Sequence, residues 1–263
     1  MNLKIGSALL FALTVFSLSG FAEENETRNN PDFTYNSSTS LSLVMVRGNN
    51  KTLSFSFDTD QNIQIKKNRL NLKGRFIDSS SNGNKKAEIY YSHLKYDREI
   101  SNCAYLLGFV RYERNKLAGY NSRIALSAGG GCTWIKQKKA EVSSELAVGW
   151  NNERNKGRVS INNAHQSSSL WQKTISSSFI SSIVDNKIVY RISKNSQLRL
   201  QETVFFNLEE MRDFRVNSYS AITVAISPNF ALQTSFQLIY EHESVPGYKN
   251  TDMYLLSSLV IKL

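Results

Sequence analysis

Three groups of residues in this 263-residue sequence carry side chains whose types and spacing could do chemistry. Cys103 and Cys132 are its two cysteines and could form a disulfide bond. His165 and Ser167 have the His-x-Ser spacing in which an imidazole can activate a hydroxyl nucleophile. The third group consists of charged residues at alternate positions of several segments. Two cysteines without a CxxC pair exclude a disulfide-rich scaffold and a zinc site, and no metal or cofactor is expected.

The N-terminal residues have the composition of an export signal. Met1 to Ala22 combines a basic residue, Lys4, with an apolar stretch and small residues at its end. We expect residues 1–22 to be a cleaved signal peptide and residues 23–33 a flexible mature N-terminus. The alternative is an uncleaved anchor helix, for which the apolar stretch is short. A net charge of +10 would suit a nucleic-acid binder, but export argues against nucleic acid as a partner.

The rest of the chain alternates between apolar and polar residues. In residues 52–65 one set of alternate positions is rich in leucine, phenylalanine and isoleucine, and the other in serine, aspartate and asparagine. A period of two is that of a β-strand with one apolar face. Residues 230–243 repeat the pattern. In residues 198–208 the pattern is less clean, because Glu202 is a carboxylate on the apolar side.

The alternation predicts about twelve strands, longer than the five or six residues that are usual in soluble sheets. Short turns and longer polar links mostly alternate between them, and both chain ends lie on the short-turn side. This layout is typical of an outer-membrane β-barrel, whose closed sheet leaves no backbone edge unpaired in lipid. We predict an all-β fold: a single closed antiparallel transmembrane barrel over residues 34–263, with short periplasmic turns and longer outer loops. The expected strands cover residues 38–47, 51–63, 66–78, 86–99, 102–114, 121–136, 139–155, 174–192, 196–210, 213–227, 230–243 and 252–263.

A soluble periplasmic β-sandwich with a binding role would also alternate, and it is the third alternative for this chain. Its strands should be shorter, and its turns should be richer in glycine and proline. The whole chain has only three prolines. Proline would remove hydrogen bonds between strands, and within lipid no water is available to replace them. The scarcity of proline therefore favours the membrane barrel.

Several short motifs give the chain a family resemblance. They are the hairpin of residues 47–54, the segment Tyr120 to Arg123 leading to the Ala-Gly-Gly-Gly run 128–131, and residues 246–252 before the last strand. With these motifs the chain from about Thr34 resembles the salt-induced outer-membrane proteins, a family catalogued as a domain of unknown function. The resemblance implies a Gram-negative outer-membrane barrel and brings no catalytic residues. The alternating last strand resembles those that the barrel-assembly machinery recognises, although it ends in leucine rather than an aromatic residue.

The two cysteines are expected to face one another across a hairpin that turns near residues 117–118. Both are expected on the outward face. A non-hydrogen-bonded antiparallel pair has Cα atoms about 4.5 Å apart, which suits a disulfide, and the periplasm is oxidising. Two free cysteines offset by a register slip are the alternative. The expected register pairs Phe109 with Leu126, Tyr105 with Gly130 and Cys103 with Cys132.

Charged residues on the polar faces of the strands are expected to line the lumen. Rings of charge set ion selectivity in a water-filled pore, so the protein could be a narrow porin-like channel for small solutes, with anions favoured. A barrel of about twelve strands is narrow, and pairs of basic and acidic residues could instead fill it, which would leave a structural barrel of the envelope under osmotic stress. The expected lumen residues are Arg69, Lys73, Arg75, Lys95, Arg111, Asp58, Asp60, Glu141 and Glu145, with Asp97 and Glu241 beside them.

A lipid-modifying barrel enzyme is the alternative from another functional class. Outer-membrane lipid A deacylases have the His-x-Ser spacing of His165 and Ser167, and the alternative is therefore a deacylase-like or phospholipase-like hydrolase. Here the two residues lie in the longest loop, among asparagines and serines and without a carboxylate to orient the imidazole. Solvated loop residues are therefore the favoured interpretation, and we expect no enzymatic activity.

The remaining basic residues gather near the expected turns. They could attract the phosphates of outer-membrane lipid and lipopolysaccharide, and ordinary solvated charge is the favoured alternative for each residue by itself. Small solutes are the other expected partners. The basic residues concerned are Lys66, Lys67, Lys136, Lys138 and Lys139 at short turns, and Arg154, Lys156, Arg158 and Lys173 at the long loop.

Overall fold

Twelve β-strands make up the part of the chain that the computed structural model describes, which is residues 33–46, 52–81, 84–116, 118–158 and 172–262. None of these residues forms a helix long and apolar enough to cross a membrane. The strands are β1 (Phe33–Val46), β2 (Thr52–Ile65), β3 (Asn68–Ser81), β4 (Asn84–Glu99), β5 (Ala104–Asn115), β6 (Tyr120–Lys136), β7 (Ala140–Arg158), β8 (Gln172–Arg191), β9 (Ser196–Asn207), β10 (Phe214–Ala225), β11 (Phe230–Glu241) and β12 (Thr251–Lys262).

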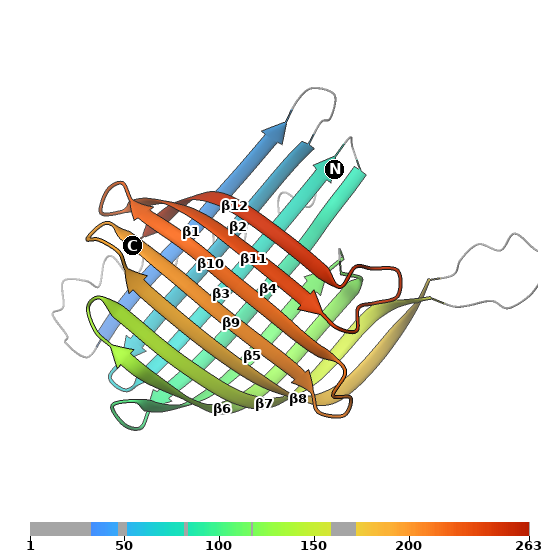
Figure 1. Cartoon of the computed structure of the whole chain (residues 1–263), viewed down its shortest axis with the longest axis horizontal. Helices are drawn as coiled ribbons and strands as arrows, with labels where there is room; N and C mark the ends of the chain where they lie inside the picture. Colours follow the sequence, from blue (N-terminus) through green and yellow to red (C-terminus); the bar gives the residue numbers. More distant parts are fainter. Residues whose placement is uncertain (1–32, 47–51, 82–83, 117, 159–171, 263) are drawn as a thin grey trace, which may run out of the picture.

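The strands form one closed antiparallel barrel. Each strand pairs with its neighbours in sequence, and β1 pairs with β12 to close the ring. The closing register aligns Ser38 with Lys262 and Leu41 with Leu259. Figure 1 shows the strong tilt of the strands, since β9 to β12 in one wall cross β1 to β5 in the other. Because the ring is closed, neither β1 nor β12 is left as an open sheet edge.

The two faces of the sheet differ in polarity. Outward-facing residues include Leu43, Trp134 and Leu255, which are 66%, 66% and 72% exposed. Ser42, the neighbour of Leu43, points inward and shares a hydrogen bond of 2.6 Å with Ser258 of β12. Alternation in the sequence therefore produces an apolar outer belt and a polar interior, which is the distribution found in barrels surrounded by lipid.

The predicted fold class and strand number are confirmed, and the strand ends shift by a few residues. The largest difference is at β1, which begins at Phe33 rather than at residue 38, because Phe33 to Ser37 pair with the end of β2. A two-residue turn joins β2 to β3, whereas residues 242–250 form a long link between β11 and β12. The predicted signal peptide and most of the predicted flexible N-terminus lie outside the described residues.

The predicted register of the β5–β6 hairpin is wrong by one residue. The pairing of the two strands shifts between Glu113 and Asn115, close to the turn. Such a bulge leaves one residue of the pair unmatched, so a register counted outward from the middle of the turn is displaced along the whole hairpin. The observed register pairs Phe109 with Ser127, Tyr105 with Gly131 and Ala104 with Cys132.

Candidate functional site in the barrel lumen

Contacts between strands that are not neighbours identify the inward face. A side chain of β4 can reach β7, and one of β6 can reach β11, only through the lumen. Lys95 of β4 forms an ion pair with Glu145 of β7, and Arg123 Nη2 of β6 lies 2.7 Å from Glu241 Oε1 of β11. Because opposed residues of paired strands point to the same face, the register carries this orientation around the barrel.

The structure places all of the predicted lumen charges on the inward face. The register opposes Asp58 to Arg75 and Asp60 to Lys73, and Arg111 to His93. Arg69, Lys95, Glu141 and Glu145 share this face. Further inward charges were missed, although parity along their strands could have identified most of them. They are Glu99, Glu113, Arg123, Lys136, Glu153, Asp185, Lys187, Arg191, Arg199, Arg215, Asp252 and Lys262.

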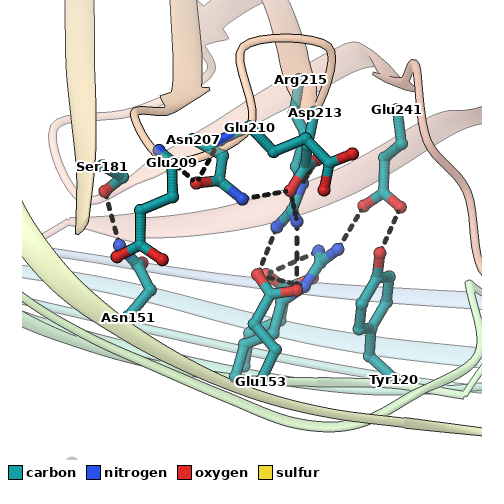
Figure 2. Close-up of polar contacts among 12 residues, drawn as sticks. Tyr120, Asn151, Glu153, Ser181, Asn207, Glu209, Glu210, Asp213, Arg215 and Glu241 are labelled. Atoms are coloured by element: carbon teal, nitrogen blue, oxygen red, sulfur yellow. Dashed lines mark hydrogen bonds and ion pairs between the residues drawn. The ribbon is translucent and has the colours of Figure 1, made fainter. Parts of the chain in front are cut away.

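Four of the inward charges form a cluster at the long-loop end of the lumen, which we name the loop-end cluster: Arg123, Glu153, Arg215 and Glu241. Figure 2 labels Glu153, Arg215 and Glu241 of this cluster. Arg215 donates two hydrogen bonds to Glu153, one of them 3.0 Å long. Arg123 lies 3.3 Å from Glu153 and 2.7 Å from Glu241. These ion pairs join β6 and β7 to β10 and β11, so they cross the lumen.

Neighbouring groups contact and bury the cluster. The Tyr120 hydroxyl donates a hydrogen bond of 3.0 Å to Glu241 Oε2. The guanidinium carbon of Arg123 lies 3.1 Å from the centroid of the Tyr120 ring. Asp213 accepts a hydrogen bond of 3.1 Å from Arg215. The two arginine side chains are 12% and 13% exposed, and both glutamates are 6% exposed. The cluster thus combines low solvent access with a partner for each charge, as buried charge requires.

Apolar side chains cover the same end of the barrel. Val245, in the link between β11 and β12, packs with Ala118 and Tyr120, and Tyr248 packs against this group. Gly119 has a φ of +84°, and a Cβ there would lie 2.7 Å from the Tyr248 ring, so glycine is required for the close approach. Because the β5–β6 and β11–β12 connections belong to strands that are not neighbours, this contact bridges the mouth of the barrel.

Aromatic residues narrow the lumen next to the loop-end cluster. The rings of Phe179 on β8 and Phe205 on β9 meet edge to face with centroids 6.0 Å apart, and each residue is 6% exposed. Phe109 of β5 packs against this pair from across the lumen. The Arg215 guanidinium lies 4.7 Å from the centroid of the Phe205 ring. Charged and aromatic side chains therefore narrow the same part of the lumen.

Toward the middle and the short-turn end, accessibility varies: Lys95 and Asp97 are only 13% and 5% exposed, whereas other lumen charges are more accessible. Asp60 lies 3.9 Å from Lys73 Nζ and 3.8 Å from an Arg199 nitrogen, and these three side chains are 24%, 34% and 38% exposed. Lys187 and Glu141 lie 2.8 Å apart and are 31% and 41% exposed. Water can therefore reach ionised groups in this stretch, in contrast to the 6–13% exposure of the loop-end cluster.

The inward charges of the described strands are nearly balanced, with basic residues slightly in excess. A large inward surplus of positive charge, on which the expected preference for anions depended, is not found on these strands. The inward basic residues are Arg69, Lys73, Arg75, Lys95, Arg111, Arg123, Lys136, Lys187, Arg191, Arg199, Arg215 and Lys262. The inward acidic residues are Asp58, Asp60, Asp97, Glu99, Glu113, Glu141, Glu145, Glu153, Asp185, Glu241 and Asp252.

The structure joins Cys103 and Cys132 as a disulfide, with Cα atoms 4.8 Å apart. Cys132 has the even parity of the outward residues of β6, such as Leu126, which is 57% exposed. Cys103 precedes β5 and so has no strand parity of its own, and its carbonyl accepts a hydrogen bond of 3.0 Å from the Thr133 amide. The bond therefore ties the β4–β5 turn to β6.

The other candidate residues do not add a site. His165 and Ser167 lie outside the described residues, so the hydrolase alternative stays a prediction from sequence. Among the described residues, no group of three or more His, Cys, Asp or Glu side chains could hold a metal ion.

Comparisons with known proteins complete the description of the site. A family model described as "Protein of unknown function, DUF481" matches residues 39–263, and no curated protein matches the sequence. The chain is similar to the translocator domain of the autotransporter NalP from Neisseria meningitidis, with 10% identity, 99% of both chains covered and a TM-score of 0.49. It is also similar to the NanC porin, with 8% identity over 87% of this chain and 98% of that chain and a TM-score of 0.47. An outer-membrane channel from Pseudomonas putida F1 gives 10% identity over 91% and 98% of the chains and a TM-score of 0.47.

Proposed function

The chain belongs to the DUF481 family, whose description gives no function, and we propose that it is an outer-membrane β-barrel forming a narrow channel that is closed near its outer end. About 9–11 residues of tilted strand cross a bilayer, and even the short strand β5 has 12 residues. The exposed apolar belt supports insertion into lipid. In such barrels short turns face the periplasm, which would direct the loop-end cluster outward.

The observation that carries the proposal is the change in accessibility along the lumen. Ionised residues such as Lys73, Asp60 and Arg199 are 24–38% exposed, which supports a water-filled passage over that stretch. Arg123 and Glu241, near the outer end, are 12% and 6% exposed. An ion that enters from the periplasm would pass the Lys95–Glu145 pair near the short-turn end, then meet hydrated charges, and meet the loop-end cluster last. The nearly balanced lumen charge favours small ions of either sign.

Planar bilayer recordings test this proposal. The Arg123→Ala, Glu241→Ala double variant removes one of the cluster's ion pairs across the lumen without changing the net charge of the lumen. We expect rare or small conductance steps from the unchanged protein and frequent, larger steps from the double variant. The matched control is the Lys136→Ala, Glu99→Ala double variant, which removes an ion pair of 3.5 Å at the short-turn rim and should behave like the unchanged protein.

A permanently filled structural barrel is the second candidate, and contacts near the short-turn end favour it. Lys95 and Glu145 pair across the lumen there, and Tyr105 donates a hydrogen bond of 2.8 Å to Glu145. In this case neither the unchanged protein nor the loop-end double variant would conduct, although both migrate in electrophoresis as folded, heat-modifiable barrels. That result would reject the channel.

Lipid is a further partner in the proposed location. Lys66, Lys67, Lys138 and Lys139 are exposed at short turns, which supports contact with anionic headgroups at the periplasmic rim. The outward row of Met253, Leu255 and Leu259 on β12, of which Leu255 is 72% exposed, supports recognition of the last strand by the barrel-assembly machinery.

A further inference from the structure

A row of polar side chains crosses the outward face of four adjacent strands. Ser144 of β7 opposes Asn186 of β8, Asn186 opposes Glu202 of β9, and Glu202 opposes Ser218 of β10. Ser144 donates a hydrogen bond of 2.7 Å to Asn186 Oδ1, and Ser218 donates one to the Glu202 carboxylate. All four residues have the parity opposite to the lumen charges of their strands. We name Ser144, Asn186, Glu202 and Ser218 the polar row.

The polar row lies within the apolar belt rather than at a rim. Along β8, Asn186 stands between the outward residues Val184 and Ile188, and along β9, Glu202 stands between Leu200 and Val204. Ile188 and Leu200 are 42% and 39% exposed. In the proposed membrane location an ionised carboxylate against lipid is unfavourable. One hydroxyl satisfies only part of a carboxylate, which can accept about four hydrogen bonds, so further donors should cover this face.

The polar row has the donors and acceptors needed to bind its own copy. The Oδ1 atom of Asn186 accepts from Ser144, which leaves the NH₂ group of this exposed residue to donate elsewhere. Glu202 is the neighbouring acceptor. A twofold interface brings the same patch of two subunits together, so that residue i meets residue j and residue j meets residue i. A twofold axis along the membrane normal, between Asn186 and Glu202, would set each amide against the carboxylate of the other copy.

We propose that the outward face of β8 to β10 binds a second copy of this chain within the membrane, through reciprocal Asn186–Glu202 hydrogen bonds. The outward face is not flat, because Ile188, Leu200, Phe236 and Glu202 line a shallow groove into which side chains of a second copy could pack. Phe236 and Ile188 are 40% and 42% exposed and would be covered by the partner copy. Lipid is disfavoured as the occupant, since acyl chains at the depth of the apolar belt offer the Glu202 carboxylate no hydrogen-bond donor.

Cross-linking between two single-cysteine variants tests the geometry. The described part of the native chain holds no free cysteine, so Asn186→Cys and Glu202→Cys each introduce one thiol. Co-expression of the two tagged variants followed by mild oxidation should give a covalent dimer that carries both tags, in higher yield than either variant with itself. Leu94→Cys, outward on β4 and 45% exposed, is the matched control and should give no dimer.

Association of the uncross-linked protein gives a second measurement. Sedimentation in detergent should show a dimer for the unchanged chain and at least tenfold weaker association for Glu202→Leu, which removes the acceptor without adding a polar group. Heat-modifiable migration shows that the variant still folds. A monomeric unchanged protein, association that Glu202→Leu leaves unaltered, or cross-links only to another protein would each overturn the proposal. None of these outcomes depends on whether the lumen conducts.

Discussion

Loss of either partner in the Glu153–Arg215 pair should destabilise the barrel and change its ion selectivity in opposite directions. Two charges about 3 Å apart interact by about 5 kcal/mol at an effective dielectric constant of 20, and desolvation offsets part of this energy. Glu153 is 6% exposed and also lies 3.3 Å from Arg123, so Glu153→Gln leaves two guanidinium groups with less compensation. We expect a loss of about 3 kcal/mol in the free energy of unfolding. Arg215→Gln should cost a similar amount.

Selectivity separates this electrostatic explanation from a general loosening of the fold. Glu153→Gln makes the narrow outer part of the lumen more positive, so its reversal potential in a KCl gradient should shift toward anions. Arg215→Gln makes the same place more negative and should shift it toward cations. Urea titration followed by tryptophan fluorescence measures the stability loss. Shifts of the same sign in both variants, or unchanged stability in both, would refute the reasoning.

Two further predictions concern the ends of the barrel. The intact mass measured without reduction should be lower than the reduced mass by the two thiol hydrogens of Cys103 and Cys132. Because 29 residues separate the cysteines, replacing both by serine should lower the free energy of unfolding by about 3–4 kcal/mol. Two titratable thiols in the native protein would contradict the bond. Gly119→Ala should cost about 1–2 kcal/mol through its positive φ and increase cleavage of residues 242–250 by added protease, because its Cβ would displace Tyr248. Gly108→Ala is the control, since the nearest atom to its Cβ would be 3.8 Å away, and equal cleavage of the two variants would argue against the cap.

The fold was predictable because a strand in a closed barrel has one repeating constraint. Each residue faces either the apolar surroundings or the polar interior, so a period of two survives over long segments such as β2 and β11. The same parity located the predicted lumen charges, including Arg75 and Lys95. It also exposed Glu202 as an exception, and the structure places this carboxylate on the outward face, as its parity indicates.

Bulges explain what parity could not predict. Tyr120 has the even number of the outward residues of β6, such as Leu126, which is 57% exposed. The pairing with β7 shifts between Tyr120 and Ser122, and this shift turns Tyr120 inward, where it bonds Glu241. The hairpin register around Phe109 failed for a related reason. An unmatched residue near a turn reverses or displaces every assignment beyond it.

Contacts across the lumen are a second feature that the sequence leaves open. Arg123 and Glu241 are 118 residues apart and lie on β6 and β11, so no local pattern joins them. Which inward residues reach the same height depends on the tilt and stagger of the whole ring of strands. The basic and acidic residues could be assigned to the lumen one by one, but their burial at one end and their hydration further along follow only from closure. A channel and a filled barrel therefore share one sequence pattern, and they differ in whether the loop-end cluster can separate.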